Sequence, residues 1–198
     1  MKFRNDASLF TVACLGPQSS GKSSLLKSLG GCGASYGRYS RGLYGSIVTT
    51  KYYGAETMLL LDTRGLLFDK SGFKSDNQMA LLSMVLSCVV LIYIEEEVFR
   101  TLMDVISVAV YALICLKLAI PKLKLLFVFR DTNKQIESQI ENTLRKVCDL
   151  AKVNLEDILD FSFILNTESR QRIFELASDN VKFCNMPYWY QLVARSLY

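Results

Sequence analysis

The clearest indication of the fold is the segment Gly16-Pro17-Gln18-Ser19-Ser20-Gly21-Lys22-Ser23. It satisfies the pattern GxxxxGK[ST] at every fixed position, and it lies between an apolar run at residues 9–15 and a helix-forming segment at residues 22–29. A buried strand, a glycine-rich turn and a helix in this order predict a phosphate-binding loop. Its main-chain N–H groups would surround the phosphates at the positive end of the helix dipole. We expect Lys22 to contact the β- and γ-phosphates and the Ser23 hydroxyl to bind Mg²⁺.

Outward from this loop, apolar runs alternate with segments of helical periodicity. The expected strands are residues 9–15, 47–53, 57–61, 88–94, 123–129 and 161–165. The expected helices are residues 22–29, 76–87, 99–118, 135–152 and 168–177, and the longest expected loops are residues 30–45 and 63–75. Strands that are apolar throughout are typical of a parallel sheet covered on both faces. We therefore predict an α/β protein with a three-layer P-loop NTPase fold, in which a mostly parallel sheet has helices on both faces.

The composition narrows the possible functions. The 198 residues suffice for one domain, and a net charge of +4 is too small to favour nucleic acid as a partner. The sequence has no histidine, which excludes imidazole-based catalytic pairs and histidine-ligated metal sites. The six cysteines form no CxxC pair, so we interpret them as free thiols and expect a cytoplasmic protein without a signal peptide. The apolar segments 81–94 and 105–116 fall short of the ~20 residues that a membrane-spanning helix needs.

A second loop follows the next buried strand. Asp62-Thr63-Arg64-Gly65 comes directly after the apolar residues 58–61. In this position the pattern DxxG is expected to place the Asp62 carboxylate near Mg²⁺, through a water, and the Gly65 N–H toward a γ-phosphate. Between the two loops, either Thr49 or Thr50 could be the threonine that ligates the metal, and the spacing does not choose between them.

The residues that read the base are expected after the strand at residues 123–129. The common guanine-reading pattern NKxD is missing there, because Asn133-Lys134 is followed by Gln135-Ile136. Arg130-Asp131 ends the strand instead. Asp131 can accept hydrogen bonds from the N1–H and the exocyclic amine of guanine, while Arg130 can stack on the base or border it. Two alternatives remain: an ion pair at the end of the strand, and an ATPase in which this dipeptide is coincidental.

Taken together, these residues resemble the guanylate-binding-protein branch of the dynamin superfamily, which also includes atlastins and very large inducible GTPases. The resemblance runs from about residue 9 to residue 131, and short stretches carry it: Gln18-Ser19-Ser20-Gly21-Lys22-Ser23-Ser24, Thr50-Lys51, Leu60-Leu61-Asp62-Thr63-Arg64-Gly65-Leu66, Asp76-Asn77-Gln78 and Arg130-Asp131. It implies a single G domain over residues 1–198, with a GTP-binding core at 9–166 and a C-terminal helical segment at 167–198. It also implies that Thr50 is the metal ligand and that Gln18 helps to position the attacking water.

The same resemblance implies a function. We expect Mg²⁺-dependent binding of GTP, its hydrolysis to GDP and phosphate, and nucleotide-dependent pairing of two G domains face to face. Peripheral membrane association through other regions or partners is also implied.

Two departures from the family pattern concern catalysis. Ser19 stands where guanylate-binding proteins and atlastins have an arginine finger, and Arg64 replaces the usual Glu or Gln. An arginine finger is worth roughly 10³–10⁵ in rate in related systems. Therefore Arg38, Arg41 or Arg64 must replace it, or a partner must, or turnover is slow. The alternative function is a nucleotide-dependent interaction module with little hydrolysis.

Overall fold

The structure is a computed structural model, and it describes residues 9–30, 42–49, 57–67, 72–117, 122–130 and 134–178. Its strands are β1 (Leu9–Leu15), β2 (Leu43–Thr49), β3 (Thr57–Thr63), β4 (Val89–Tyr93), β5 (Leu123–Phe129) and β6 (Leu159–Leu165). They form one sheet in the order β2-β3-β1-β4-β5-β6. Each neighbouring pair is parallel except β2 with β3, which is antiparallel. The prediction of a mostly parallel sheet is confirmed.

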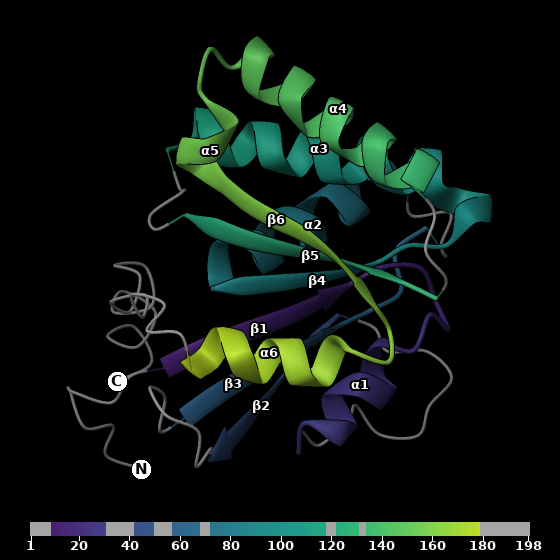
Figure 1. The fold of residues 1–198 in the computed structure, drawn as a ribbon, viewed down its shortest axis with the longest axis vertical. Helices are drawn as coiled ribbons and strands as arrows, with labels where there is room; N and C mark the ends of the chain where they lie inside the picture. The colour runs from purple at the N-terminus through teal and green to yellow at the C-terminus, as the bar shows by residue number, and fades with distance from the viewer. Residues whose placement is uncertain are drawn as a thin grey trace.

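The helices cover both faces of this sheet. They are α1 (Lys22–Ser28), α2 (Phe73–Leu86), α3 (Phe99–Cys115), α4 (Lys134–Leu150), α5 (Leu155–Ile158) and α6 (Ser169–Ser178), with a 3₁₀ turn, η1 (Glu96–Val98), before α3. Figure 1 shows α2, α3 and α4 on one face, and α1 and α6 on the other. The three-layer fold predicted from the sequence is therefore confirmed.

The alternation of side chains along β1 explains the continuous apolar runs. Phe10, Val12 and Cys14 pack in the cluster that includes α1 and α6, whereas Ala13 and Leu15 pack in the cluster beneath α2, α3 and α4. All five are 0 % exposed. Because both faces of a central strand are buried, every residue of it must be apolar or find a partner.

The structure differs from several expectations about local structure. Residues 43–45, expected in a loop, belong to β2, which begins four residues before the predicted strand and is antiparallel. Residues 73–75, also expected in a loop, form the start of α2. The short helix α5 and the turn η1 were not expected at all. The expected extension of the second strand over residues 50–53 lies outside the described residues.

The longest apolar helical segment belongs to the core. Within the part of the chain that the structure describes, Glu96–Cys115 is the one segment long and apolar enough to cross a membrane, with 20 residues and a mean hydropathy of 1.9. The shorter apolar run at residues 105–116, which the sequence marked as too short to span a membrane, lies mostly within this segment. Half of Glu96–Cys115 is buried, and Leu102, Ile106 and Val110 are each 0 % exposed against the sheet and its neighbouring helices. This packing accounts for its apolar character.

Candidate nucleotide-binding site

The phosphate-binding loop is held by glycines at both ends. Gly16 follows β1 with a φ of 141°, and a Cβ there would lie 2.8 Å from the Cβ of Tyr93. Gly21, with a φ of 100°, is the residue before α1. Positive φ values and this close approach leave room only for glycine. The loop therefore has the tight turn that the sequence pattern predicted.

The Lys22 side chain is enclosed by the loop that precedes it. Its ammonium group donates hydrogen bonds to the carbonyl oxygens of Gly16, at 3.0 Å, and Pro17, and to Oγ of Ser20 at 3.3 Å. Lys22 is only 5 % exposed, and this burial lowers its pKa, while the nearby carboxylates of Asp62 and Glu95 act in the opposite direction. A buried cation is thus held within the turn where the sequence predicts that phosphates bind.

The two predicted metal ligands that the structure describes are in direct contact. Oγ of Ser23 donates a 2.7 Å hydrogen bond to Oδ2 of Asp62. The other carboxylate oxygen of Asp62, Oδ1, is buried and has no hydrogen-bond partner in the described part of the protein. The described residues contain no group of three or more acidic, cysteine or histidine side chains that could enclose a metal alone. Mg²⁺ usually takes one or two carboxylates together with water and phosphate oxygens, so this donor set fits it.

The acidic loop, residues 62–67, is joined to the phosphate-binding loop by main-chain contacts. The N–H of Leu66 donates to the carbonyl oxygen of Gly16 at 3.0 Å, and Pro17 and Leu66 form a parallel bridge. A Cβ on Gly65 would lie 2.6 Å from Cα and 2.8 Å from the main-chain N of Gln18. Only glycine permits this approach, so the two loops form one unit at the carboxyl ends of β1 and β3.

The side chain of Arg64 is held by the start of α2. Its Nη2 donates 2.7 Å hydrogen bonds to Oγ of Ser75 and to Oδ1 of Asp76. Oδ2 of Asp76 accepts a 3.0 Å hydrogen bond from the N–H of Leu67. From the sequence, Asp76 was noted only as part of a family resemblance, and this contact was not predicted.

A buried tyrosine supports the phosphate-binding loop and was also missed. Tyr93, the last residue of β4, is 4 % exposed and packs against Gly16 and Gly21. Its hydroxyl has no hydrogen-bond partner among the described residues, and burial raises its pKa. The available signal was its place at the end of the strand that pairs with β1.

The structure describes some of the remaining predicted site residues, and others lie outside the described ranges. Arg130 is exposed at the end of β5, and this strand is parallel to β4 and hence to β1, so Arg130 lies at the same edge of the sheet as the phosphate-binding loop. Gln18 and Ser20 are half-buried, and Ser19 and Ser24 are exposed. Thr50, Asp131 and the candidate finger residues Arg38 and Arg41 lie outside the described residues.

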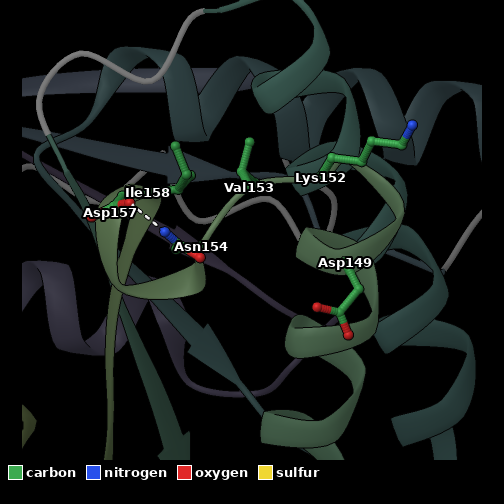
Figure 2. Close-up of a pocket in the computed structure, with 6 residues that line it drawn as sticks. All are labelled: Asp149, Lys152, Val153, Asn154, Asp157 and Ile158. Atoms are coloured by element: carbon green, nitrogen blue, oxygen red, sulfur yellow. Dashed lines mark hydrogen bonds between the residues drawn. The ribbon is translucent and has the colours of Figure 1, made fainter.

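A separate cavity of ≈ 550 Å³ lies between the end of α4 and α5 (Figure 2). Because α5 directly precedes β6, this cavity lies at the amino ends of the strands, away from the phosphate-binding loop. The residues that line it are Asp149, Lys152, Val153, Asn154, Asp157 and Ile158. Nδ2 of Asn154 donates a 3.1 Å hydrogen bond to Oδ2 of Asp157. None of the predicted site residues borders this cavity.

The strand order, the phosphate-binding loop after β1 and the acidic loop after β3 give the chain the fold of a P-loop GTPase G domain. No family model matches it. The chain is 28% identical over 193 residues to interferon-induced very large GTPase 1 of Mus musculus, an alignment that covers 87% of this chain and 8% of that protein. The chain thus spans about 8% of the length of this curated relative. The relationship supports a GTPase G domain without defining a branch of the superfamily.

Two solved structures match this chain in part. The mammalian SRP receptor matches with a TM-score of 0.50 and 17% identity, over 85% of this chain and 98% of that chain. A dimerization-deficient mutant of Toc33 from Arabidopsis thaliana matches with a TM-score of 0.45 and 19% identity, over 81% of this chain and 72% of that chain. At 17% identity, the likeness to the SRP receptor concerns the fold alone.

Proposed function

We propose that this chain is a Mg²⁺-dependent GTP-binding domain that hydrolyses GTP to GDP and phosphate. The observation that carries the proposal is the buried Lys22 ammonium within the phosphate-binding loop, beside the paired Ser23 and Asp62. A cation, a hydroxyl and a carboxylate with one unpartnered oxygen are the groups that a magnesium–triphosphate complex requires. They lie at the carboxyl edge of the sheet, where α/β proteins bind ligands.

The protein's own residues would act mainly by alignment and charge. Lys22 would exchange its contacts with loop carbonyls for contacts with phosphate oxygens. The Gly65 N–H would donate to the γ-phosphate, and Gln18 would orient the attacking water, as the family resemblance implies. Ser23, Asp62 and Thr50 would hold Mg²⁺, which neutralises developing charge on the phosphates. Phosphoryl transfer needs little covalent chemistry beyond such positioning.

Specificity for guanine is assigned to Arg130 and Asp131. The exposed Arg130 at the end of β5 supports this assignment, because it lies at the edge of the sheet that carries the phosphate-binding loop. In Asp131→Asn, an NH₂ group that donates hydrogen bonds replaces one of the carboxylate oxygens that accept them. The variant should therefore shift its preference from guanine toward xanthine nucleotides, while excess ATP should fail to displace labelled GTP from the native chain.

We also propose that two copies pair through their nucleotide-binding faces and that hydrolysis is coupled to this pairing. The resemblance to guanylate-binding proteins and atlastins supports the pairing. The same resemblance supports a peripheral association with membranes, made through other regions or partners. Turnover per molecule that rises with protein concentration would support coupling. The buried free thiols of Cys14 and Cys148 support the proposal of a reducing, cytoplasmic compartment.

A second candidate function is a nucleotide-dependent interaction module with little hydrolysis. Two observations favour it: Ser19 stands at the position of the family's arginine finger, and the Arg64 guanidinium is engaged by Ser75 and Asp76. Tight GTP binding with negligible turnover at every protein concentration would identify the module.

The decisive experiment is calorimetric titration with GTP, GDP and ATP, with and without Mg²⁺. Lys22→Ala should lower the affinity for guanine nucleotides by about two orders of magnitude, since it removes the principal cation of the site. Lys146→Ala, on the exposed face of α4, is the matched control and should bind as the native chain does. Undiminished binding by Lys22→Ala, or no binding of GTP by the native chain, would overturn the proposal.

A further inference from the structure

Asp76, in the first turn of α2, contacts the acidic loop at two separate points. Its Oδ1 accepts a hydrogen bond from Nη2 of Arg64, and its Oδ2 accepts one from the main-chain N–H of Leu67. Gly65 lies between these two points in the chain. One carboxylate therefore holds the acidic loop on both sides of the residue whose N–H is assigned to the γ-phosphate.

The ion pair between Arg64 and Asp76 is strengthened by its burial and by its position at the start of α2. Asp76 is 5 % exposed and the Arg64 side chain 15 % exposed, so the ion pair is largely removed from water and is screened less than a surface pair. The carboxylate also lies in the first turn of α2, where the helix dipole favours negative charge.

The backbone of Leu67 shows that the loop is held in a specific conformation. Its φ is 63°, in the left-handed region that non-glycine residues adopt at a cost in free energy. The N–H that it presents in this conformation is the one that Asp76 accepts. On the other side of Gly65, the N–H of Arg64 donates to the carbonyl oxygen of Gly42 at 2.8 Å. The loop thus has little freedom to move Gly65 while Asp76 is in place.

We propose that Asp76 is the positioning residue of the acidic loop: it holds the Gly65 N–H in place for the γ-phosphate, so that the domain distinguishes GTP from GDP. The inference rests on the proposed function. Asp76 acts through the loop and does not itself touch the nucleotide. In this assignment Arg64 serves as the anchor that the carboxylate grips, in place of an arginine finger.

The test compares the affinity for a non-hydrolysable GTP analogue with the affinity for GDP, both with Mg²⁺, by calorimetry. Asparagine has one side-chain oxygen, so Asp76→Asn cannot accept hydrogen bonds from both Arg64 and Leu67 with separate oxygens. We expect it to weaken binding of the analogue about tenfold and binding of GDP less than about twofold. Arg64→Gln keeps the Leu67 contact and should show a smaller loss. The double variant should be no weaker than Asp76→Asn, because both changes remove the same pair.

Asp160→Asn is the matched control. Asp160 lies on the edge strand β6, where its carboxylate pairs with Lys124 at 3.7 Å, and the variant removes the negative charge. It should leave the ratio of the two affinities unchanged. If Asp76→Asn still binds both nucleotides, equal losses of affinity for the two, or no loss, would overturn the inference. If Asp76→Asn fails to bind GDP, Arg64→Gln carries the test and must weaken analogue binding at least about threefold with GDP binding unchanged. A native chain that binds neither nucleotide overturns the proposed function instead.

Discussion

The Ser23 hydroxyl donates a 2.7 Å hydrogen bond to Oδ2 of Asp62, and this bond joins the first turn of α1 to β3 across 39 positions of the chain. The contact orients a carboxylate whose other oxygen is buried without a partner in the described part of the protein. Such an oxygen is costly to bury unless a ligand satisfies it. The pair therefore supplies a direct way to test for a metal.

Asp62→Asn should make nucleotide binding insensitive to Mg²⁺. Asparagine can still accept the hydrogen bond from Ser23, but it carries no negative charge to favour a divalent cation. Removal of Mg²⁺ with EDTA should weaken GDP binding by about tenfold in the native chain and by less than about twofold in the variant. Titration of both proteins with GDP, with and without EDTA, measures the difference. An unchanged response to Mg²⁺ in Asp62→Asn would exclude this carboxylate from the metal site.

Gly65→Ala should destabilise the domain and weaken GTP binding. The added Cβ would lie 2.6 Å from Cα of Gln18, so the acidic loop must move away from the phosphate-binding loop. Overpacking of this kind costs about 1–3 kcal/mol. Gly45→Ala is a matched control, because its Cβ would meet Leu59 at an ordinary 3.5 Å on the edge strand β2. Urea unfolding of both variants makes the comparison, and equal stability would contradict the close contact between the loops.

Tyr93→Phe should stabilise the protein by about 1 kcal/mol. The Tyr93 hydroxyl is buried without a hydrogen-bond partner among the described residues, and its removal relieves the cost of desolvation while the ring still packs against Gly16. The free energy of unfolding, measured by chemical denaturation, is the readout. A decrease in stability would reveal a partner for this hydroxyl.

Substitutions in α3 should separate its buried face from its exposed one. Leu102 is 0 % exposed, and Leu102→Ala should cost about 2–5 kcal/mol through the cavity it leaves. Val108 is 49 % exposed on the same helix, and Val108→Ala should stay within about 0.5 kcal/mol of the native chain. Thermal or urea unfolding compares the two. Similar effects at both positions would contradict the packing of α3 as a core helix.

The sequence predicted best those features that local patterns determine. β5 occupies Leu123–Phe129, the same seven residues as expected, because an apolar run bounded by Pro121 and Arg130 leaves few alternatives. The phosphate-binding loop followed from its glycine spacing and from the strand and helix on either side. In both cases the determining interactions lie within a few residues of one another.

Features that depend on tertiary contacts were not predictable in this way. The start of β2 contains Gly45 and Ser46, which have low strand propensity, and it is a strand because it pairs with β3 at the edge of the sheet. The contact between Arg64 and Asp76 spans 12 positions and depends on the path of the loop between them. No periodicity specifies such a path. The roles assigned to Thr50 and Asp131 stay predictions, because these residues lie outside the described ranges.

The bridge between Pro17 and Leu66 is made by main-chain atoms, with the N–H of Leu66 bonded to the carbonyl oxygen of Gly16. Because the donor and the acceptor are main-chain groups, substitutions of the surrounding side chains remove neither of them, provided that Gly16 and Gly65 are kept. Such a domain can therefore keep its architecture through side-chain changes that would abolish hydrolysis, and a domain that only binds its ligand can still serve in recognition.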